Sequence, residues 1–134
     1  MAEKKQDVQI VGNIGMYYVC YRLSELGWNV MPTARNARGI DVIAYSPDGK
    51  RYLGIQIKTL SKRNPIPVGS NLSKVMGDFW FVVVRQKSGD PNVYVMTPEE
   101  VRAMAHKSGA NHWIEPPKYD CEKFLNKWDR IGST

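Results

Sequence analysis

Apolar positions near the start of the chain predict one helix. Over residues 13–26 they cover more than one side of a helical turn, so this helix is expected to be largely buried or to share an interface. Asn13 is expected to cap its start, and Gly27 is expected to end it. Gly12 and Gly15 lower the helix propensity near the start and would permit a close backbone contact there.

Short runs rich in β-branched and aromatic residues predict a sheet. The expected strands are residues 28–31, 40–45, 52–59, 79–84 and 93–96. The run 79–84 is apolar throughout, which is typical of a central strand covered on both faces. Pro47, Asp48 and Gly49 predict a tight turn that joins the second and third strands into a hairpin.

Further helices are expected around these strands. Thr97, Pro98 and Glu100 predict a helix start with a capping box, and this helix should run to about residue 107. A helical turn is expected within 72–76 and a last helix over 120–128, with Phe124 and Trp128 docked on the body. This order of elements predicts an α/β or α+β fold whose mixed central sheet is flanked by helices, in one domain spanning residues 1–134.

Composition narrows the set of partners. Nineteen Lys and Arg residues against 13 Asp and Glu give a net charge of +6 and a pI near 9.4, which favours a polyanionic partner, nucleic acid first. No apolar stretch is long enough to cross a bilayer, so no membrane partner is expected. The first residues lack the apolar run of a signal peptide, and Cys20 and Cys121 lie far apart without a ligand-pair spacing. We therefore expect a cytoplasmic protein with reduced cysteines.

The predicted hairpin brings polar residues to one face. Alternate residues of a strand share a face, so Gln56 and Lys58 point the same way on the second strand. If Ser46 pairs with Arg51 across a four-residue loop, Asp41 lies opposite Gln56. Their Cβ atoms would then be about 5 Å apart, with Lys58 as the diagonal neighbour.

These residue types suit divalent-metal chemistry. Asp41 offers a hard carboxylate oxygen for Mg²⁺ or Mn²⁺, Gln56 a neutral amide oxygen, and Ile57 a backbone carbonyl. Lys58 would orient or activate water and offset charge on a phosphate. A second interpretation is that these are the solvated residues of an ordinary sheet, with a surface ion pair between Asp41 and Lys58. The pattern alone favours this second interpretation.

A resemblance to a known family favours the metal-site interpretation over the solvated sheet face. The run 39–45 (Gly-Ile-Asp-Val-Ile-Ala-Tyr), a turn, and the run 54–59 (Gly-Ile-Gln-Ile-Lys-Thr) resemble the core of the PD-(D/E)XK nuclease superfamily. The chain is most similar to small single-domain members such as archaeal Holliday-junction resolvases, whose first helix also ends in Gly-aromatic-x-Val, here residues 27–30. The resemblance covers residues 12–59 and continues to residue 84 in the order of elements only.

The resemblance implies a restriction-endonuclease-like αβββαβ core that hydrolyses phosphodiester bonds with Mg²⁺ or Mn²⁺. Asp41 matches the family aspartate and Lys58 the family lysine, whereas Gln56 stands where Glu or Asp is usual. Tyr17 or Tyr18 falls near the place of the carboxylate that many members carry on the first helix.

Basic residues flank the hairpin face and are expected to contact phosphates: Arg35, Arg38, Lys62, Arg63 and Lys74. The leading hypothesis is a metal-dependent endonuclease that acts on DNA rather than RNA, with Asp41, Gln56 and Lys58 as catalytic residues and Asp41, Gln56 and Ile57 as metal ligands. The alternative is a degenerate nuclease fold that only binds nucleic acid. A third hypothesis is a protein-interaction subunit that assembles through the first helix. A homodimer is expected because a nuclease that cuts two strands needs two sites and because the tyrosine-rich first helix exceeds what one small domain can bury.

Overall fold

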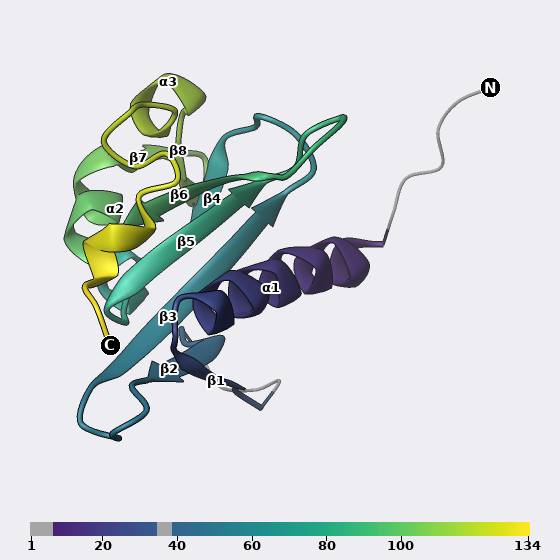
Figure 1. The fold of residues 1–134 in the computed structure, drawn as a ribbon. Helices are drawn as coiled ribbons and strands as arrows, with labels where there is room; N and C mark the ends of the chain where they lie inside the picture. The colour runs from purple at the N-terminus through teal and green to yellow at the C-terminus, as the bar shows by residue number, and fades with distance from the viewer. Residues whose placement is uncertain (1–6, 35–38) are drawn as a thin grey trace.

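The computed structural model describes residues 7–34 and 39–134, which form two sheets surrounded by helices (Figure 1). The five-stranded sheet contains β1 (Asn29–Pro32), β2 (Val42–Tyr45), β3 (Tyr52–Leu60), β5 (Phe79–Val84) and β6 (Asn92–Met96). The three-stranded sheet contains β4 (Ile66–Gly69), β7 (His106–Ser108) and β8 (Asn111–Ile114). The helices are α1 (Val8–Glu25), α2 (Pro98–Met104) and α3 (Pro116–Tyr119), with 3₁₀ turns η1 (Leu72–Lys74) and η2 (Trp128–Ile131).

The larger sheet is mixed, as predicted. Its order is β1-β2-β3-β5-β6, in which β3 and β5 run parallel and every other neighbouring pair is antiparallel. The connection from β3 to β5 contains β4 and η1 and returns the chain, so that the two strands run in the same direction. Because they are parallel, their carboxyl ends lie at the same edge of the sheet. This shared edge determines where the basic residues described below collect.

Two hydrophobic clusters sandwich this sheet. On one face α1 and η2 cover the sheet, and on the other face the smaller sheet, α2 and α3 cover β5 and β6 (Figure 1). Phe81 and Val83 belong to the first cluster, whereas Trp80, Val82 and Val84 belong to the second. The prediction that the run 79–84 is a strand buried on both faces is therefore confirmed.

Helix α1 begins earlier than expected. Asp7 is its cap and accepts a hydrogen bond from the backbone N–H of Gln9 (2.8 Å), so the prediction that Asn13 caps the helix is wrong. The helix continues through Gly12 because a helical glycine costs only about 1 kcal/mol relative to alanine. Gly27 follows the helix end with φ +95°, as predicted.

The close backbone contact expected near the start of α1 occurs at Gly15. A Cβ atom at this position would lie 1.8 Å from Oγ1 of Thr59 on β3. The same atom at Gly12 would meet nothing within 4 Å. Among the described helices, none combines the length and the apolar character needed to span a bilayer.

The second half of the chain departs most from the sequence-based elements. Helix α2 has the expected capping box between Thr97 and Glu100, but it ends at Met104 and residues 106–108 form β7. The predicted helix over 120–128 is wrong, because this segment instead follows the outer edge of β6. There the Val95 N–H donates to the Phe124 carbonyl at 3.0 Å. Phe124 and Trp128 are nevertheless buried, as expected.

Candidate active site and basic groove

The β2–β3 hairpin has the register that its turn predicts. Ser46 and Arg51 close a four-residue loop, with the Ser46 N–H donating to the Arg51 carbonyl at 2.9 Å. Tyr45 pairs with Tyr52, and the pairing continues to the Asp41 N–H, which donates to the Ile55 carbonyl at 2.8 Å. The regular pairing thus ends at Val42 and Ile55, so the predicted pair of Asp41 with Gln56 is not part of the ladder. The Asp41 carboxylate is nevertheless close enough to Lys58 to act on its charge.

The Asp41 carboxylate is held in place by the strand beside it. Its Oδ2 accepts a hydrogen bond from the backbone N–H of Ile57 at 2.8 Å, just beyond the end of β2. The side chain thus occupies the position that a backbone carbonyl of β2 would take if the ladder continued. Because Asp41 is half-buried and bonded to the backbone, its carboxylate is oriented before any ligand arrives.

Lys58 is enclosed on one side by an aromatic ring. Its Nζ lies 5.5 Å from the centroid of the Trp80 ring, a cation–π distance. Trp80 pairs with Gln56 in the parallel ladder and is 4% exposed. Burial lowers the pKa of Lys58 from its ordinary value, and the Asp41 carboxylate acts in the opposite direction. A lysine whose charge is destabilised by burial and favoured by a carboxylate is common in functional sites.

A divalent cation would find a limited donor set here. Among the described residues, no group of three or more His, Cys, Asp or Glu side chains is arranged to hold a metal ion. Asp41 supplies one carboxylate, Gln56 an amide oxygen and Ile57 a backbone carbonyl. Mg²⁺ usually keeps several waters and takes one or two protein carboxylates together with substrate phosphates. The residues therefore fit a Mg²⁺ ion that binds together with a phosphate ligand.

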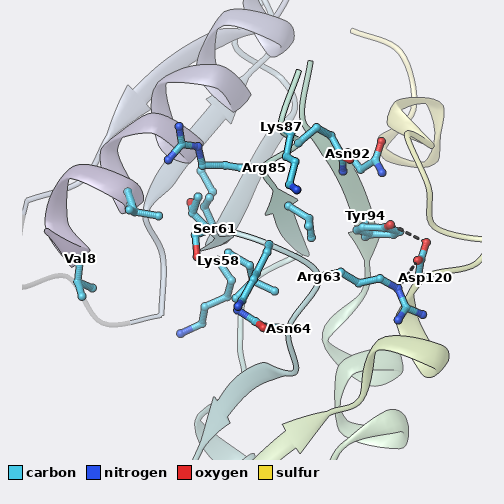
Figure 2. Close-up of a pocket in the computed structure, with 18 of the residues that line it drawn as sticks. Val8, Lys58, Ser61, Arg63, Asn64, Arg85, Lys87, Asn92, Tyr94 and Asp120 are labelled. Carbon is cyan, nitrogen blue, oxygen red and sulfur yellow. Dashed lines mark hydrogen bonds and ion pairs between the residues drawn. The ribbon is translucent and has the colours of Figure 1, made fainter. Parts of the chain in front are cut away.

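A groove of about 1810 Å³ opens at the carboxyl ends of β3 and β5 (Figure 2). The first turns of α1 form one wall, and the loop after β3 and the β5–β6 connection form the others. Five basic side chains are among its described lining residues: Lys58, Lys62, Arg63, Arg85 and Lys87. Asp120 is the one acidic residue in the same set. Lys58 belongs both to the Asp41 face and to this groove.

The basic residues expected to contact phosphates do not all meet. Lys62 and Arg63 line the groove beside Lys58, whereas Lys74 lies exposed on η1 and is not among the lining residues. Arg35 and Arg38 lie outside the described residues. Arg85 and Lys87 were missed by the sequence-based reasoning. Their signal was their position directly after the buried strand 79–84, since basic residues that follow two parallel strands meet at one edge.

Comparison with solved structures identifies the fold. The Archaeoglobus fulgidus Holliday junction resolvase Hjc superposes with a TM-score of 0.61 and 14% sequence identity, over 92% of this chain and 97% of the resolvase chain. The bacterial homing endonuclease I-Ssp6803I superposes with a TM-score of 0.62 and 16% identity, over 94% of this chain and 93% of that chain. The fold is that of restriction-endonuclease-like nucleases. No family model matches the sequence, and no curated protein matches it.

Proposed function

We propose that this chain is a metal-dependent endonuclease that hydrolyses phosphodiester bonds of DNA. The observation that carries the proposal is the Asp41 carboxylate, which accepts the Ile57 N–H and interacts electrostatically with Lys58. Two further observations support it. The fold is shared with a Holliday junction resolvase and a homing endonuclease, and a basic groove begins at Lys58.

In this proposal Asp41, Gln56 and the Ile57 carbonyl hold Mg²⁺ or Mn²⁺. The ion would supply Lewis-acid polarisation of the phosphate and a more acidic water. Lys58 contributes an ammonium group on the same face, where it stabilises negative charge that develops on the phosphate oxygens. Trp80 keeps water away from one side of Lys58, which strengthens the effect of its charge.

Two conservative variants test the chemistry without disturbing the hairpin. Asp41→Asn keeps an oxygen that accepts the Ile57 N–H but removes the charge. Lys58→Met keeps an alkyl chain against Trp80 and removes the ammonium group. We expect each to lower the rate of cleavage of branched or duplex DNA in Mg²⁺ or Mn²⁺ by about 100-fold or more, the range found for preorganised electrostatic groups.

Lys107→Met is the matched control, because Lys107 lies exposed on β7 and does not line the groove. It should leave cleavage unchanged. The same residual cleavage in the wild type and in both site variants would refute the assignment of Asp41 and Lys58 as catalytic residues.

A second candidate function is a DNA-binding module that does not cut. It is favoured by the single carboxylate of the site, since Gln56 is neutral and Glu25 is the one acid within α1, exposed at its end. This candidate predicts salt-sensitive binding without cleavage, with an affinity that Asp41→Asn does not reduce. Binding in EDTA and cleavage in Mg²⁺, measured on the same preparations, separate the two functions.

The outer side of α1 supports the proposal of a homodimer. Ile10, Tyr17 and Tyr21 recur on one stripe of this helix and are 51%, 62% and 60% exposed. Cleavage of both strands of a duplex needs two sites, which a second copy of the chain would provide. Light scattering should give a dimer mass for the wild type and a monomer mass for Tyr17→Lys. A monomeric wild type at high concentration would exclude a stable homodimer.

A third candidate, a protein-interaction subunit, rests on the same apolar side chains of α1. Absence of DNA binding at low salt would favour it over both DNA-directed functions.

A further inference from the structure

Two buried tyrosines hold the groove in place, one bonded to the loop that follows β3 and the other bonded to Asp120. Tyr119 of α3 is fully buried, and its hydroxyl donates to the Asn64 carbonyl at 2.7 Å. Tyr94 of β6 is 1% exposed, and its hydroxyl donates to Oδ1 of Asp120 at 2.6 Å. These bonds attach the loop and Asp120 to rigid elements.

Asp120 uses its other oxygen to hold Arg63. Oδ2 accepts a hydrogen bond from Nε of Arg63 at 2.7 Å, and Figure 2 shows the two side chains together at the groove. No described residue forms a hydrogen bond with either terminal nitrogen of Arg63. A guanidinium group held through Nε presents its terminal N–H donors to an outside acceptor, and paired N–H donors match phosphate oxygens.

The charge state of Asp120 suits this arrangement. The hydrogen bond from Tyr94, followed by the hydrogen bond from Arg63, lowers the pKa of Asp120 below its ordinary value. Asp120 is therefore ionised at neutral pH and remains a strong acceptor for Nε. An isolated exposed ion pair contributes little to stability. Arg63 and Asp120 are 53% and 31% exposed, so orientation of the guanidinium is the main effect of the pair.

We propose that Arg63 binds a phosphate of the DNA backbone in the groove at the carboxyl ends of β3 and β5, and that Asp120 is the positioning residue for Arg63. The identity of the ligand as DNA rests on the proposed function. Lys62 and Lys87 line the same groove and add positive charge along the path of the backbone. Lys58 lies where this path reaches the Asp41 face, so the groove leads the bound strand to the candidate active site.

A positioning role and a purely electrostatic role for Asp120 predict opposite changes in DNA affinity when Asp120 is replaced. Removing an acid from a basic groove strengthens DNA binding if charge alone matters. Removing the group that orients Arg63 weakens binding if Arg63 is the phosphate ligand. Asp120→Asn is the appropriate change, because it removes the charge at almost unchanged volume and leaves one acceptor oxygen where the carboxylate accepts from both Tyr94 and Arg63.

The experiment measures the anisotropy of a labelled duplex and a labelled single strand of the same sequence, in EDTA and over a range of salt concentrations. Both probes carry the same phosphate chemistry, and the two arms show which form the groove prefers. We expect Arg63→Gln to weaken binding severalfold and to reduce the slope of log affinity against log salt by about one unit. Asp120→Asn should weaken binding severalfold in the wild type but not in the Arg63→Gln background. Lys107→Met should change neither affinity nor slope.

Stronger binding by Asp120→Asn in the wild type, or equal effects in both backgrounds, would overturn the positioning role. Unchanged binding by Arg63→Gln, or no DNA binding by the wild type, would overturn the groove assignment. Cleavage assays keep this inference separate from the proposed function. If Asp41→Asn abolishes cleavage while the groove variants bind DNA normally, the role of Arg63 and Asp120 in DNA binding is refuted and the endonuclease proposal stands. If DNA binding depends on Arg63 and Asp120 but the wild type does not cleave DNA, the endonuclease proposal is refuted and DNA binding in the groove is supported.

Discussion

Replacing Gly15 by alanine tests how closely α1 approaches the sheet. The added Cβ atom would lie 1.8 Å from Oγ1, 2.8 Å from Cβ and 2.9 Å from Cγ2 of Thr59. Rotation of the Thr59 side chain moves Oγ1 and Cγ2, but it leaves the 2.8 Å contact with Cβ unchanged. Helix α1 must therefore shift away from β3. Forcing an extra methyl group into a packed site costs about 1–3 kcal/mol.

Gly12 provides a control within the same helix. Alanine at either position improves helix propensity by up to about 1 kcal/mol, so this contribution cancels when the two variants are compared. At Gly12 the new methyl group would meet nothing within 4 Å. We expect Gly12→Ala to stabilise the protein slightly. Gly15→Ala should have a free energy of unfolding about 1–3 kcal/mol below that of Gly12→Ala, through the packing cost alone.

Urea denaturation followed by the fluorescence of the buried Trp28, Trp80 and Trp128 gives both values. In a double-mutant cycle, Thr59→Ala removes two of the three close atoms and should recover part of the loss, with a coupling of about 0.5–3 kcal/mol. Equal stabilities of the Gly12→Ala and Gly15→Ala variants would refute the close approach of α1 to β3. Additive effects of Gly15→Ala and Thr59→Ala would show that the Thr59 side chain does not cause the steric conflict with a Cβ atom at position 15.

Three further predictions concern titratable groups. Burial opposes ionisation of Glu100, but hydrogen bonds led by Arg130 outweigh it and lower its pKa from 4.5 to about 2. Glu100→Gln should therefore have an unfolding free energy about 3 kcal/mol below that of the wild type at neutral pH. This difference should disappear as pH falls from 4.5 towards 2. A difference that does not change with pH in urea titrations would contradict this. Burial lowers the pKa of Lys58, so its charge destabilises the fold below that lowered pKa. Lys58→Met should be more stable than the wild type at neutral pH, and the gain should shrink as pH rises through the lowered pKa and be gone by pH 10.5. Lower stability of Lys58→Met at neutral pH would argue against it. Burial raises the pKa of the Cys20 thiol, so a thiol reagent should modify the half-buried Cys121 first in the native protein. Comparable modification rates at both cysteines would show that Cys20 is accessible.

The hairpin and its polar face could be predicted because local chemistry determines them. The Pro47-Asp48-Gly49 turn specifies the loop length, and the loop length specifies which residues face each other. The pairs from Tyr45–Tyr52 to Val42–Ile55 follow from that register without knowledge of any other element. The bond from the Ile57 N–H to Asp41 could not be predicted, since it depends on where β2 stops pairing with β3.

The groove could not be predicted, because it is assembled from distant segments. Lys62 and Lys87 meet only because β3 and β5 pair in parallel across a crossover, and periodicity within a strand does not reveal its partner. Asp120 was assigned to a helix that does not form. The start of α1 was misplaced for a simpler reason: Asp7 and Asn13 are both good caps, and the apolar residues between them extend the helix to the earlier one.

The segment along β6 has a consequence for how the molecule avoids strand pairing with other molecules at the edge of its sheet. Besides the bond to Val95, the Asn126 N–H donates to the Val93 carbonyl at 2.6 Å, and Oδ1 of Asn126 accepts the Val93 N–H at 3.0 Å. These contacts occupy backbone groups that an outermost strand would otherwise offer to a strand from another molecule. Residues 124–126 therefore protect the outer edge of β6 from pairing with a strand of another molecule. Asn126→Pro, which removes the N–H that pairs with Val93 and keeps the buried side chains of the segment, should therefore form light-scattering aggregates rich in β-structure at concentrations where the wild type stays dispersed.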